Sequence, residues 1–439
     1  MKDSFGKFFS SPSFKFIVIG TLSLLLMIPA AMIKNLIRER ESRNETVRME
    51  ISEKWGLAQT ITGPFITIPT EEVVKDRYNE DIVYHRFHML PAHLSIEGEI
   101  IPMEKKRGIF SSVVYNSTIH ITGYFDLNEE GLEQLIKKNI QTEKVYLSIG
   151  ITDLRGIGNN SKITINSVPT EFRPGLYNHE ITDRGIHVPI EFSDIQDLDK
   201  ISFSATLVLN GSSDIYFIPV GKTTEARLTS TWPDPSFTGS FLPSDKEISV
   251  DGFTSSWSIN YLNRNYPQSW QDGGHNVNDS AFGVNFLVPV NHYQKSTRAA
   301  KYAFMFIALT FLVFFLTEVI SKKRIHAIQY ILVGFALIIF YTLLVSLSEH
   351  IGFNNAYLVS MLSVTVLIGY YIKTSTKSTR VGLISGSLLL VLYSYLFTTL
   401  QLQDLSLLMG SIGLFVVLAI IMIVSRRINW YKEKTEQND

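Results

Sequence analysis

The chain has 439 residues, 45% of them hydrophobic, and a formal net charge of −1. This length allows two or three folded units, and a charge so near zero gives no electrostatic reason to bind nucleic acid. Cysteine is absent, which excludes disulfides, thiolate metal sites and cysteine nucleophiles. The hydrophobic residues crowd near the N-terminus and into the last third of the chain. That distribution is typical of a membrane protein with one large extramembrane domain, so the lipid bilayer is the first expected partner.

The first apolar run follows a short basic segment, residues 1–13, which we expect in the cytoplasm. The run continues from Phe16 through Ile33 without a convincing small-x-small cleavage site. The apolar part of a signal peptide is about 7 to 15 residues long and ends at such a site. Residues 14–37 therefore favour an uncleaved transmembrane anchor over a signal peptide.

Residues 38–298 have the pattern of one β-rich domain preceded by a charged helical stalk. From Ile201 to Leu209 apolar residues alternate with smaller or polar ones, which predicts a half-buried strand. Similar patterns predict strands near 61–68, 83–90, 93–101, 113–125, 145–152, 162–168, 185–190, 215–220, 226–231, 252–262 and 282–288. Many strands separated by glycine and proline indicate a mainly antiparallel sandwich.

Residues 299–425 contain five further apolar runs, each long enough to cross a bilayer of about 30 Å. The expected spans are 302–320, 325–347, 353–372, 381–399 and 405–424, followed by a cytoplasmic tail at 426–439. Lysine and arginine follow the second, fourth and sixth spans of the chain, whereas the loops at 349–352 and 400–404 have none. The expected fold class is an α-helical bundle of six spans joined to a large β-rich domain. By the positive-inside rule, both termini lie in the cytoplasm and the β-rich domain lies outside.

Three polar residues lie at the predicted outer ends of the spans: Glu349, His350 and Asp404. Successive helical residues point about 100° apart, so Glu349 and His350 are poorly placed to ligate one ion together. We expect this rim to dock the outer domain onto the bundle. Near the inner interface, Glu318 lies four residues before Lys322, a spacing that favours a local ion pair over a functional acid.

Small residues form a face between Gly382 and Gly386, which indicates close packing of two helices. No charged residue lies at mid-depth in a predicted span. A transporter normally needs polar groups along its path, so transport is the least favoured of the functions considered.

The most distinctive part of the outer domain is the segment from Trp232 to Pro243. Its prolines and glycine predict a loop, not a regular strand. In one interpretation the loop covers an end of the sandwich and its rings are part of the core. In the other, Trp232, Pro235, Phe237 and Phe241 form a binding loop for a protein partner or an envelope glycan.

No metal, cofactor or catalytic site is expected. His85 and His88 would face opposite sides of a strand and so could not share a metal ion. The sequence has no serine hydrolase signature and no acid pair with a clear spacing. The sequence leaves open one alternative, a glycosidase whose catalytic carboxylates are distant in the sequence.

Many short strings resemble the CreD family of inner membrane proteins over nearly the whole chain. They are Trp55-Gly56, Gln59, Gly63-Pro64, Trp232 to Pro243, Phe282-Gly283-Val284, Arg298 to Tyr302, Ser346 to Phe353, Ala356-Tyr357 and Leu407 to Ser411. The resemblance implies a bacterial inner membrane protein with a periplasmic domain, associated with envelope integrity and with an envelope-responsive two-component system. It supplies no catalytic residues. We therefore expect a protein that acts by binding through its periplasmic domain, with an enzyme that modifies an envelope glycan or lipid as the alternative.

Overall fold

The computed structural model describes residues 12–75, 80–128, 144–191, 198–286, 292–321, 326–402 and 406–425. The chain forms two compact units. The helical unit comprises Met1–Arg43 and Val290–Asp439, and the β domain comprises Asn44–Pro289. Helix α3 contributes its first part to the helical unit and its last part to the β domain.

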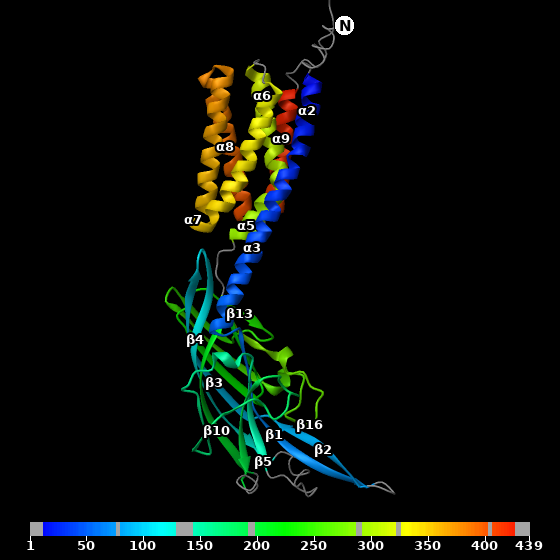
Figure 1. Cartoon of the computed structure of the whole chain (residues 1–439), viewed down its shortest axis with the longest axis vertical. Coiled ribbons are helices and arrows are strands. Elements are labelled where there is room, and N and C mark those ends of the chain that lie inside the picture. The colour runs from blue at the N-terminus through cyan, green and yellow to red at the C-terminus, as the bar shows by residue number, and fades with distance from the viewer. Residues whose placement is uncertain are drawn as a thin grey trace, which may run out of the picture. The chain divides into compact units, whose positions relative to one another are not determined.

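Seven helices are described, and they lie side by side in the helical unit except for the end of α3 (Figure 1). They are α2 (Pro12–Leu25), α3 (Met27–Trp55), α5 (His292–Lys301), α6 (Ala303–Ser321), α7 (Ala327–Thr376), α8 (Thr379–Gln401) and α9 (Ser406–Ser425). Three helical segments among the described residues are long and apolar enough to cross a membrane: Ile19–Trp55, Ile328–Thr376 and Thr379–Gln401. Helices α5 and α6, bent by 54°, would together make a fourth. The full count of six spans remains a prediction.

Helix α7 folds back on itself at Gly352, where the backbone leaves the helical region (φ 74°, ψ 162°). Gln329 and Ser375 lie near its two ends, yet the Gln329 amide donates a hydrogen bond of 2.6 Å to the Ser375 hydroxyl. In a straight helix these residues would be about 70 Å apart. Two antiparallel helices therefore meet at Gly352, which lies between the spans predicted at 325–347 and 353–372.

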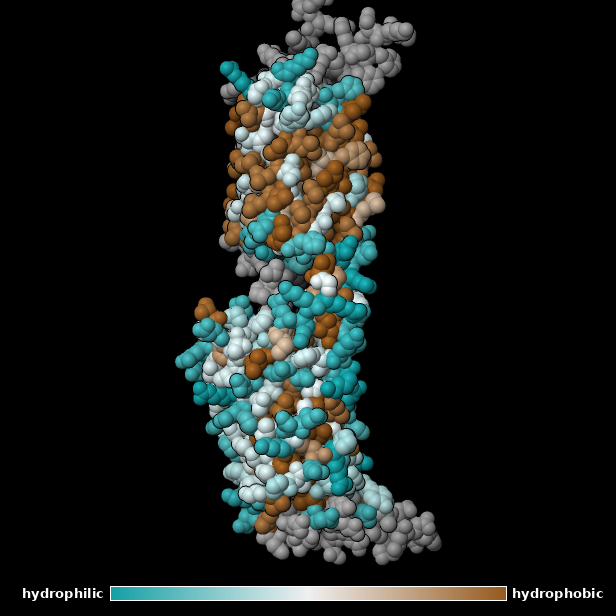
Figure 2. Space-filling model, turned by 60° about the vertical axis from the view of Figure 1, so that its left-hand side comes forward, coloured by the Kyte–Doolittle hydropathy of each residue, from teal (hydrophilic) through white to brown (hydrophobic). Residues whose placement is uncertain are grey.

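The helical unit exposes large apolar residues, and its mainly apolar interior also buries several polar ones. On the visible face a broad hydrophobic belt surrounds the helices (Figure 2). Large apolar side chains of this unit are strongly exposed, for example Phe415 at 72% and Val366 at 68%. In contrast, Thr310 and Ser385 are fully buried between helices. This arrangement suits a surface that contacts hydrocarbon and not water.

The β domain contains two sheets. The first runs β13-β17-β11-β1-β5-β9-β8, with β2 paired to β1 and β16 paired to β2, and the second runs β14-β15-β12-β3-β4-β10-β6-β7. The first sheet has β1 (Gln59–Lys75), β2 (Glu80–Met89), β5 (Lys144–Ile151), β8 (Arg173–Pro174), β9 (Gly185–Glu191), β11 (Asp214–Ile218), β13 (Pro235–Gly239), β16 (Ser269–Gln271) and β17 (Phe282–Phe286). The second has β3 (His93–Arg107), β4 (Phe110–Asp126), β6 (Lys162–Ile165), β7 (Val168–Thr170), β10 (Lys200–Ser212), β12 (Thr223–Ser230), β14 (Asp245–Ser249) and β15 (Gly252–Asn260). Short 3₁₀ helices occupy Leu154–Gly156, Tyr261–Asn263 and Asn278–Ser280.

Both sheets contribute to one hydrophobic core, as expected for a sandwich. The predicted strand at residues 201–209 belongs to β10, and its five inward residues are at most 3% exposed. The other predicted strands are present within the described residues, except that residues 162–168 do not form one strand: they hold β6, a turn and the start of β7, which pairs with β6 as a hairpin. Pairing is mainly antiparallel as predicted, but β1 with β11 and β3 with β12 are parallel, so the sheets are mixed.

The segment after Trp232 was wrongly predicted to contain no regular strand. Residues Pro235–Gly239 form β13, which pairs with β17 in antiparallel register. β13 is the edge strand of the first sheet. A proline is tolerated there because an edge strand leaves one row of its N–H groups unpaired.

The last turn of α3 is fastened to the sandwich by side-chain hydrogen bonds. The Trp55 indole donates to the Tyr115 carbonyl (3.1 Å), and the Leu57 N–H donates to the Asp153 carboxylate (2.9 Å). Gln59 donates to the carbonyls of Asp153 (2.9 Å) and Asn210 (3.1 Å). Trp55 and Gln59 were among the residues that carry the family resemblance, and their place in this joint gives them a structural role.

Candidate functional site

The predicted rim residues occupy different surroundings. The Glu349 carboxylate accepts a hydrogen bond from the Tyr293 hydroxyl (3.0 Å) and lies 4.0 Å from the Arg40 guanidinium. The Glu349 side chain is only 9% exposed, whereas His350 is exposed. Asp404 lies outside the described residues. Glu349 thus has partners inside the helical unit, and docking of the β domain at this rim remains a prediction.

Glu318 is buried, at 7% exposure, near the end of α6. Its carboxylate accepts a hydrogen bond of 3.1 Å from the Tyr330 hydroxyl on α7. Lys322 lies outside the described residues, so the predicted ion pair is untested. The Tyr330 contact still gives this acid a local structural partner, which could not be inferred from the i,i+4 spacing.

The aromatic residues after Ser230 pack against the core. Phe237 on β13 contacts Phe253 and Trp257 edge-on, with ring centroids 5.5 and 5.9 Å apart. Trp232 contacts Phe286 edge-on at 6.4 Å. Trp232, Phe237 and Phe241 are all only partly buried, and Pro235 is half-buried. These contacts support the core interpretation, while a binding role for this segment stays a hypothesis.

A cluster that the sequence did not suggest lies on β2. Alternate residues of a strand share a face, so Arg86 and His88 point the same way. They bind the two oxygens of Glu180: Arg86 Nη1 donates to Oε1 and His88 Nε2 to Oε2, each over 2.7 Å. Glu180 belongs to the loop between β8 and β9, about ninety residues away, and no local pattern links it to β2. We call these three residues the Glu180 clamp.

The Glu180 clamp continues into the protein interior through Thr67. The His88 ring is 0% exposed, and its Nδ1 lies 3.1 Å from the Thr67 hydroxyl. An ionised carboxylate can only accept hydrogen bonds, so Nε2 carries the proton and Nδ1 accepts from Thr67. Burial lowers the pKa of His88, and the carboxylate of Glu180 only partly offsets this effect. The ring is therefore neutral at pH 7.

Thr67, His88 and Glu180 have the residue types of a hydrolytic triad, but they cannot act as one. Thr67 is 1% exposed and His88 is 0% exposed, so neither can reach a substrate. Only Glu180 has an accessible surface, at 22%. His85, on the opposite face of β2, binds Asp272 (2.7 Å) instead of joining His88. Among the described residues no group of three or more histidine, aspartate or glutamate side chains could hold a metal ion.

Glu180 also lines a cavity of about 880 Å³ on the β domain. The walls come from the loop before β9, the loop after β16 and the adjoining ends of β1, β5 and β11. Its polar lining residues are Thr60, Thr152, His179, Glu180, Thr182, Asp183, Arg184, His275, Asn276 and Asn278. Trp270 joins this cavity to the Glu180 clamp, because its ring lies 5.5 Å from His88 and 5.3 Å from His275. We call it the Glu180 pocket.

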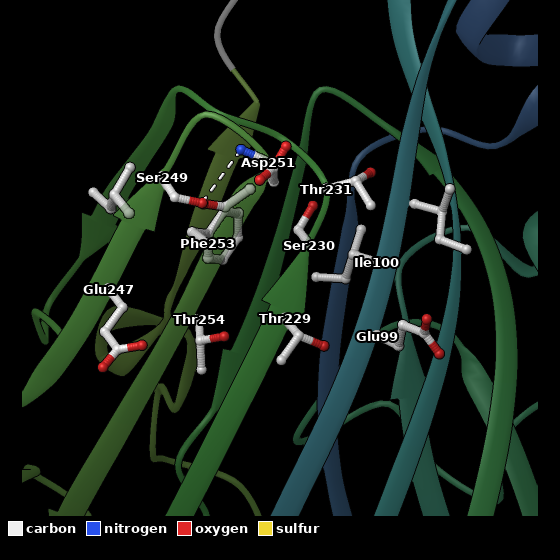
Figure 3. A pocket seen from close by; sticks show the side chains of 13 residues that line it. Glu99, Ile100, Thr229, Ser230, Thr231, Glu247, Ser249, Asp251, Phe253 and Thr254 are labelled. Carbon is white, nitrogen blue, oxygen red and sulfur yellow. Dashed lines mark hydrogen bonds between the residues drawn. The ribbon is translucent and has the colours of Figure 1, made fainter.

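A second depression, of about 380 Å³, lies on the second sheet (Figure 3). Glu247, Thr254, Thr229 and Glu99 form a row across four neighbouring strands, as the pairing register requires. A neighbouring depression of about 400 Å³ shares Glu99 and Thr229. These side chains form a shallow polar face of the kind that any solvated sheet presents. The Glu180 pocket is larger and has a buried histidine, His88, with a lowered pKa behind its wall, so it is the better candidate for a site.

Comparison with known proteins covers both units. A family model described as "Inner membrane protein CreD" matches residues 11–431. Inner membrane protein CreD of Escherichia coli (strain K12) is 33% identical over 414 residues, which span 93% of this chain and 91% of that protein. The match extends through the helical unit and the β domain, so it concerns the whole architecture and not one part. The chain belongs to the CreD family of inner membrane proteins.

Proposed function

We propose that this inner membrane protein maintains cell envelope integrity by binding an envelope component through a periplasmic β domain. The observation that carries the proposal is the Glu180 pocket, a cavity of about 880 Å³ with convergent polar groups on an extramembrane domain. A binding role fits better than catalysis because the hydroxyl and imidazole behind the pocket wall are buried and cannot reach a substrate. The resemblance to the CreD family supports the link to the envelope.

The proposed topology has six spans, with both termini in the cytoplasm. Four features support it: the fold-back of α7, the length of α8, and α6 and α9, which at 19 and 20 residues could each cross about 30 Å. The turn at Gly352 is then periplasmic, and the basic turn near Lys377 is cytoplasmic.

This topology is directly testable because the chain has no cysteine to give background labelling. A single cysteine in place of His350 should react with a membrane-impermeant maleimide once the outer membrane is opened. A cysteine in place of Lys377 should react only after the inner membrane is also permeabilised. The reverse pattern would reject the proposed orientation.

The envelope role is tested by complementation. A strain lacking the gene should show greater envelope permeability and altered antibiotic sensitivity, and the unaltered gene should restore both. A variant with His275→Gln and Thr182→Val in the Glu180 pocket should not restore them, whereas Glu99→Gln on the second sheet should. An unchanged barrier in the deletion strain would reject the envelope role. New products in envelope extracts incubated with the purified full-length protein would favour the enzyme alternative.

A further inference from the structure

We propose that the Glu180 pocket binds an uncharged, hydroxyl-rich ligand, specifically a short oligosaccharide. This inference rests on the proposed function and names its ligand class. It follows from three properties of the lining: its balance of charge, the kind of hydrogen-bonding groups it presents, and how firmly these groups are held.

The charges at the pocket nearly cancel. Glu180 is neutralised by the Arg86 guanidinium, 2.7 Å from its carboxylate. The remaining charged lining residues, Asp183 and Arg184, have opposite signs. An anionic ligand such as a phosphate group would meet no excess of basic residues in this lining, whereas an anion site normally has one. A lipid chain would leave the many polar lining groups without partners, at a cost in free energy.

The uncharged polar groups can both donate and accept hydrogen bonds. Threonine hydroxyls, asparagine amides and neutral imidazoles each have both capacities. Sugar hydroxyls have the same dual capacity, so a dense set of such side chains can satisfy a carbohydrate without precise matching of charge. The partly exposed aliphatic side chain of Leu57, which also lines the pocket, can contact the C–H face of a sugar ring.

Several of these groups are fixed before any ligand arrives. His179 Nδ1 lies 2.8 Å from the Asp183 carbonyl, which sets the orientation of that ring. His275 packs edge-on against Trp270 at 5.3 Å. The Asn276 amide donates to Asp279 over 2.9 Å. Groups that are already ordered lose less conformational entropy on binding, which favours affinity for a flexible polar ligand.

Glu180 itself acts as a positioning residue for this pocket. Its two carboxylate oxygens are held by Arg86 and His88, so the loop that contains His179, Thr182 and Asp183 is tied to β2. The clamp thereby fixes one wall of the pocket relative to the other wall, in which His275 lies.

The experiment uses the full-length protein in lipid nanodiscs and isothermal titration with two probes, chitotetraose and inorganic phosphate. The neutral tetrasaccharide should bind and phosphate should not. His275→Gln and the nearly isosteric Thr182→Val should each weaken chitotetraose binding by about three- to tenfold, the effect of losing one hydrogen bond. Glu99→Gln, on the other sheet, is the matched control and should leave binding unchanged. Tryptophan emission verifies that each variant is folded.

Binding of phosphate without the tetrasaccharide, no binding of either probe, or tetrasaccharide binding that survives both pocket variants would overturn the carbohydrate assignment. The complementation assay separates this failure from failure of the proposed function. If the protein binds no sugar but the pocket variants still fail to restore the envelope barrier, the carbohydrate assignment is rejected and the proposed binding role is retained. Pocket variants that restore the barrier fully reject both.

Discussion

The β domain and the helical unit both bury apolar side chains, but they differ in what they expose. In the β domain Ile119 and Leu207 are 0% exposed, and the outward positions of the strands are mostly polar. In the helical unit Val366 is 68% exposed, while the carboxylate of Glu318 and the hydroxyl of Thr310 are buried. Water drives apolar groups inward in the first case. In hydrocarbon that driving force is absent, so polar contacts and close packing hold the second together.

Close packing in the helical unit depends on small residues. A side chain at Gly382 would place its first carbon 2.9 Å from the Gly369 carbonyl, and one at Gly386 would lie 3.9 Å from the Gly369 Cα. The Thr317 and Ser385 hydroxyls lie 2.9 Å apart in the same region. The small face predicted between residues 382 and 386 is thus where α8 approaches α7. Hydroxyl pairs and glycine contacts therefore add to the packing of buried apolar side chains, such as Phe340 and Leu389, in the helical unit.

The largest expected effect comes from placing the same charge on an exposed valine in each unit. Val366→Lys, near the middle of the second half of α7, should cost about 3 kcal/mol because hydrocarbon solvates an ammonium group poorly. Val250→Lys, in the β domain at 88% exposure, should change stability by less than about 0.5 kcal/mol. The amount of protein in the membrane fraction and its elution from size-exclusion chromatography measure both. Equal yields of the two variants would contradict the conclusion that the exposed surface of the helical unit contacts hydrocarbon.

A smaller difference is expected between two glycines that both have positive φ. At Gly56 (φ 143°) an added Cβ would lie 2.5 Å from the Asn210 carbonyl oxygen, so Gly56→Ala combines backbone strain with a clash. We expect a loss of at least about 2 kcal/mol. At Gly352 (φ 74°, ψ 162°) no atom lies within 4 Å, so Gly352→Ala should cost only the strain of a backbone conformation that is nearly exclusive to glycine, about 1–3 kcal/mol. Thermal unfolding in detergent compares them, and a larger loss at Gly352 would contradict the clash argument.

Much of the fold could be predicted because its signals are local. The alternation in β10 and the polar string around Gly352 each report the structure of their own segment. The edge strand at Pro235 was missed because a proline argues against a strand unless the edge position is known. The parallel pairing of β1 with β11 and the contact of Glu180 with His88 join residues that are far apart in the sequence. No local pattern encodes them, so the pocket that they build could not be foreseen.

The joint between α3 and the sandwich gives a further test within the β domain. The Asp153 carboxylate is 3% exposed and accepts hydrogen bonds from Leu57 and from Arg155 Nε (2.9 Å). Asp153→Asn should cost about 2 kcal/mol because charge-assisted hydrogen bonds in a buried position are lost. The exposed Asp251→Asn is the control and should cost almost nothing. Four of the five tryptophans lie in the β domain, so denaturant unfolding followed by tryptophan emission reports on it.

Asp153 also makes the β domain sensitive to acid. Burial raises the pKa of Asp153, but the hydrogen bonds from Arg155 and Leu57 more than offset this, and the pKa lies below its usual value. A carboxyl with a depressed pKa contributes stability above its unfolded pKa, near 3.9, and loses it as pH falls through the folded value. Asp153→Asn should therefore unfold with a weaker pH dependence below pH 4 than the unaltered protein.

The smallest expected effect concerns His88 and operates at a milder pH. Its pKa is lowered by burial, so the unfolded chain takes up a proton near pH 6.5 while the folded protein does not. Stability is complete above that pH and decreases below it, by at most about 1.4 kcal/mol per pH unit. Between pH 7 and 5.5 the unfolding midpoint should fall less in His88→Gln than in the unaltered protein. His120→Gln, at an exposed position of β4, should keep the full dependence. If the His88→Gln variant also kept the full pH dependence, His88 could not be the buried neutral imidazole that donates to Glu180. Another residue would then have to hold the Glu180 loop against β2.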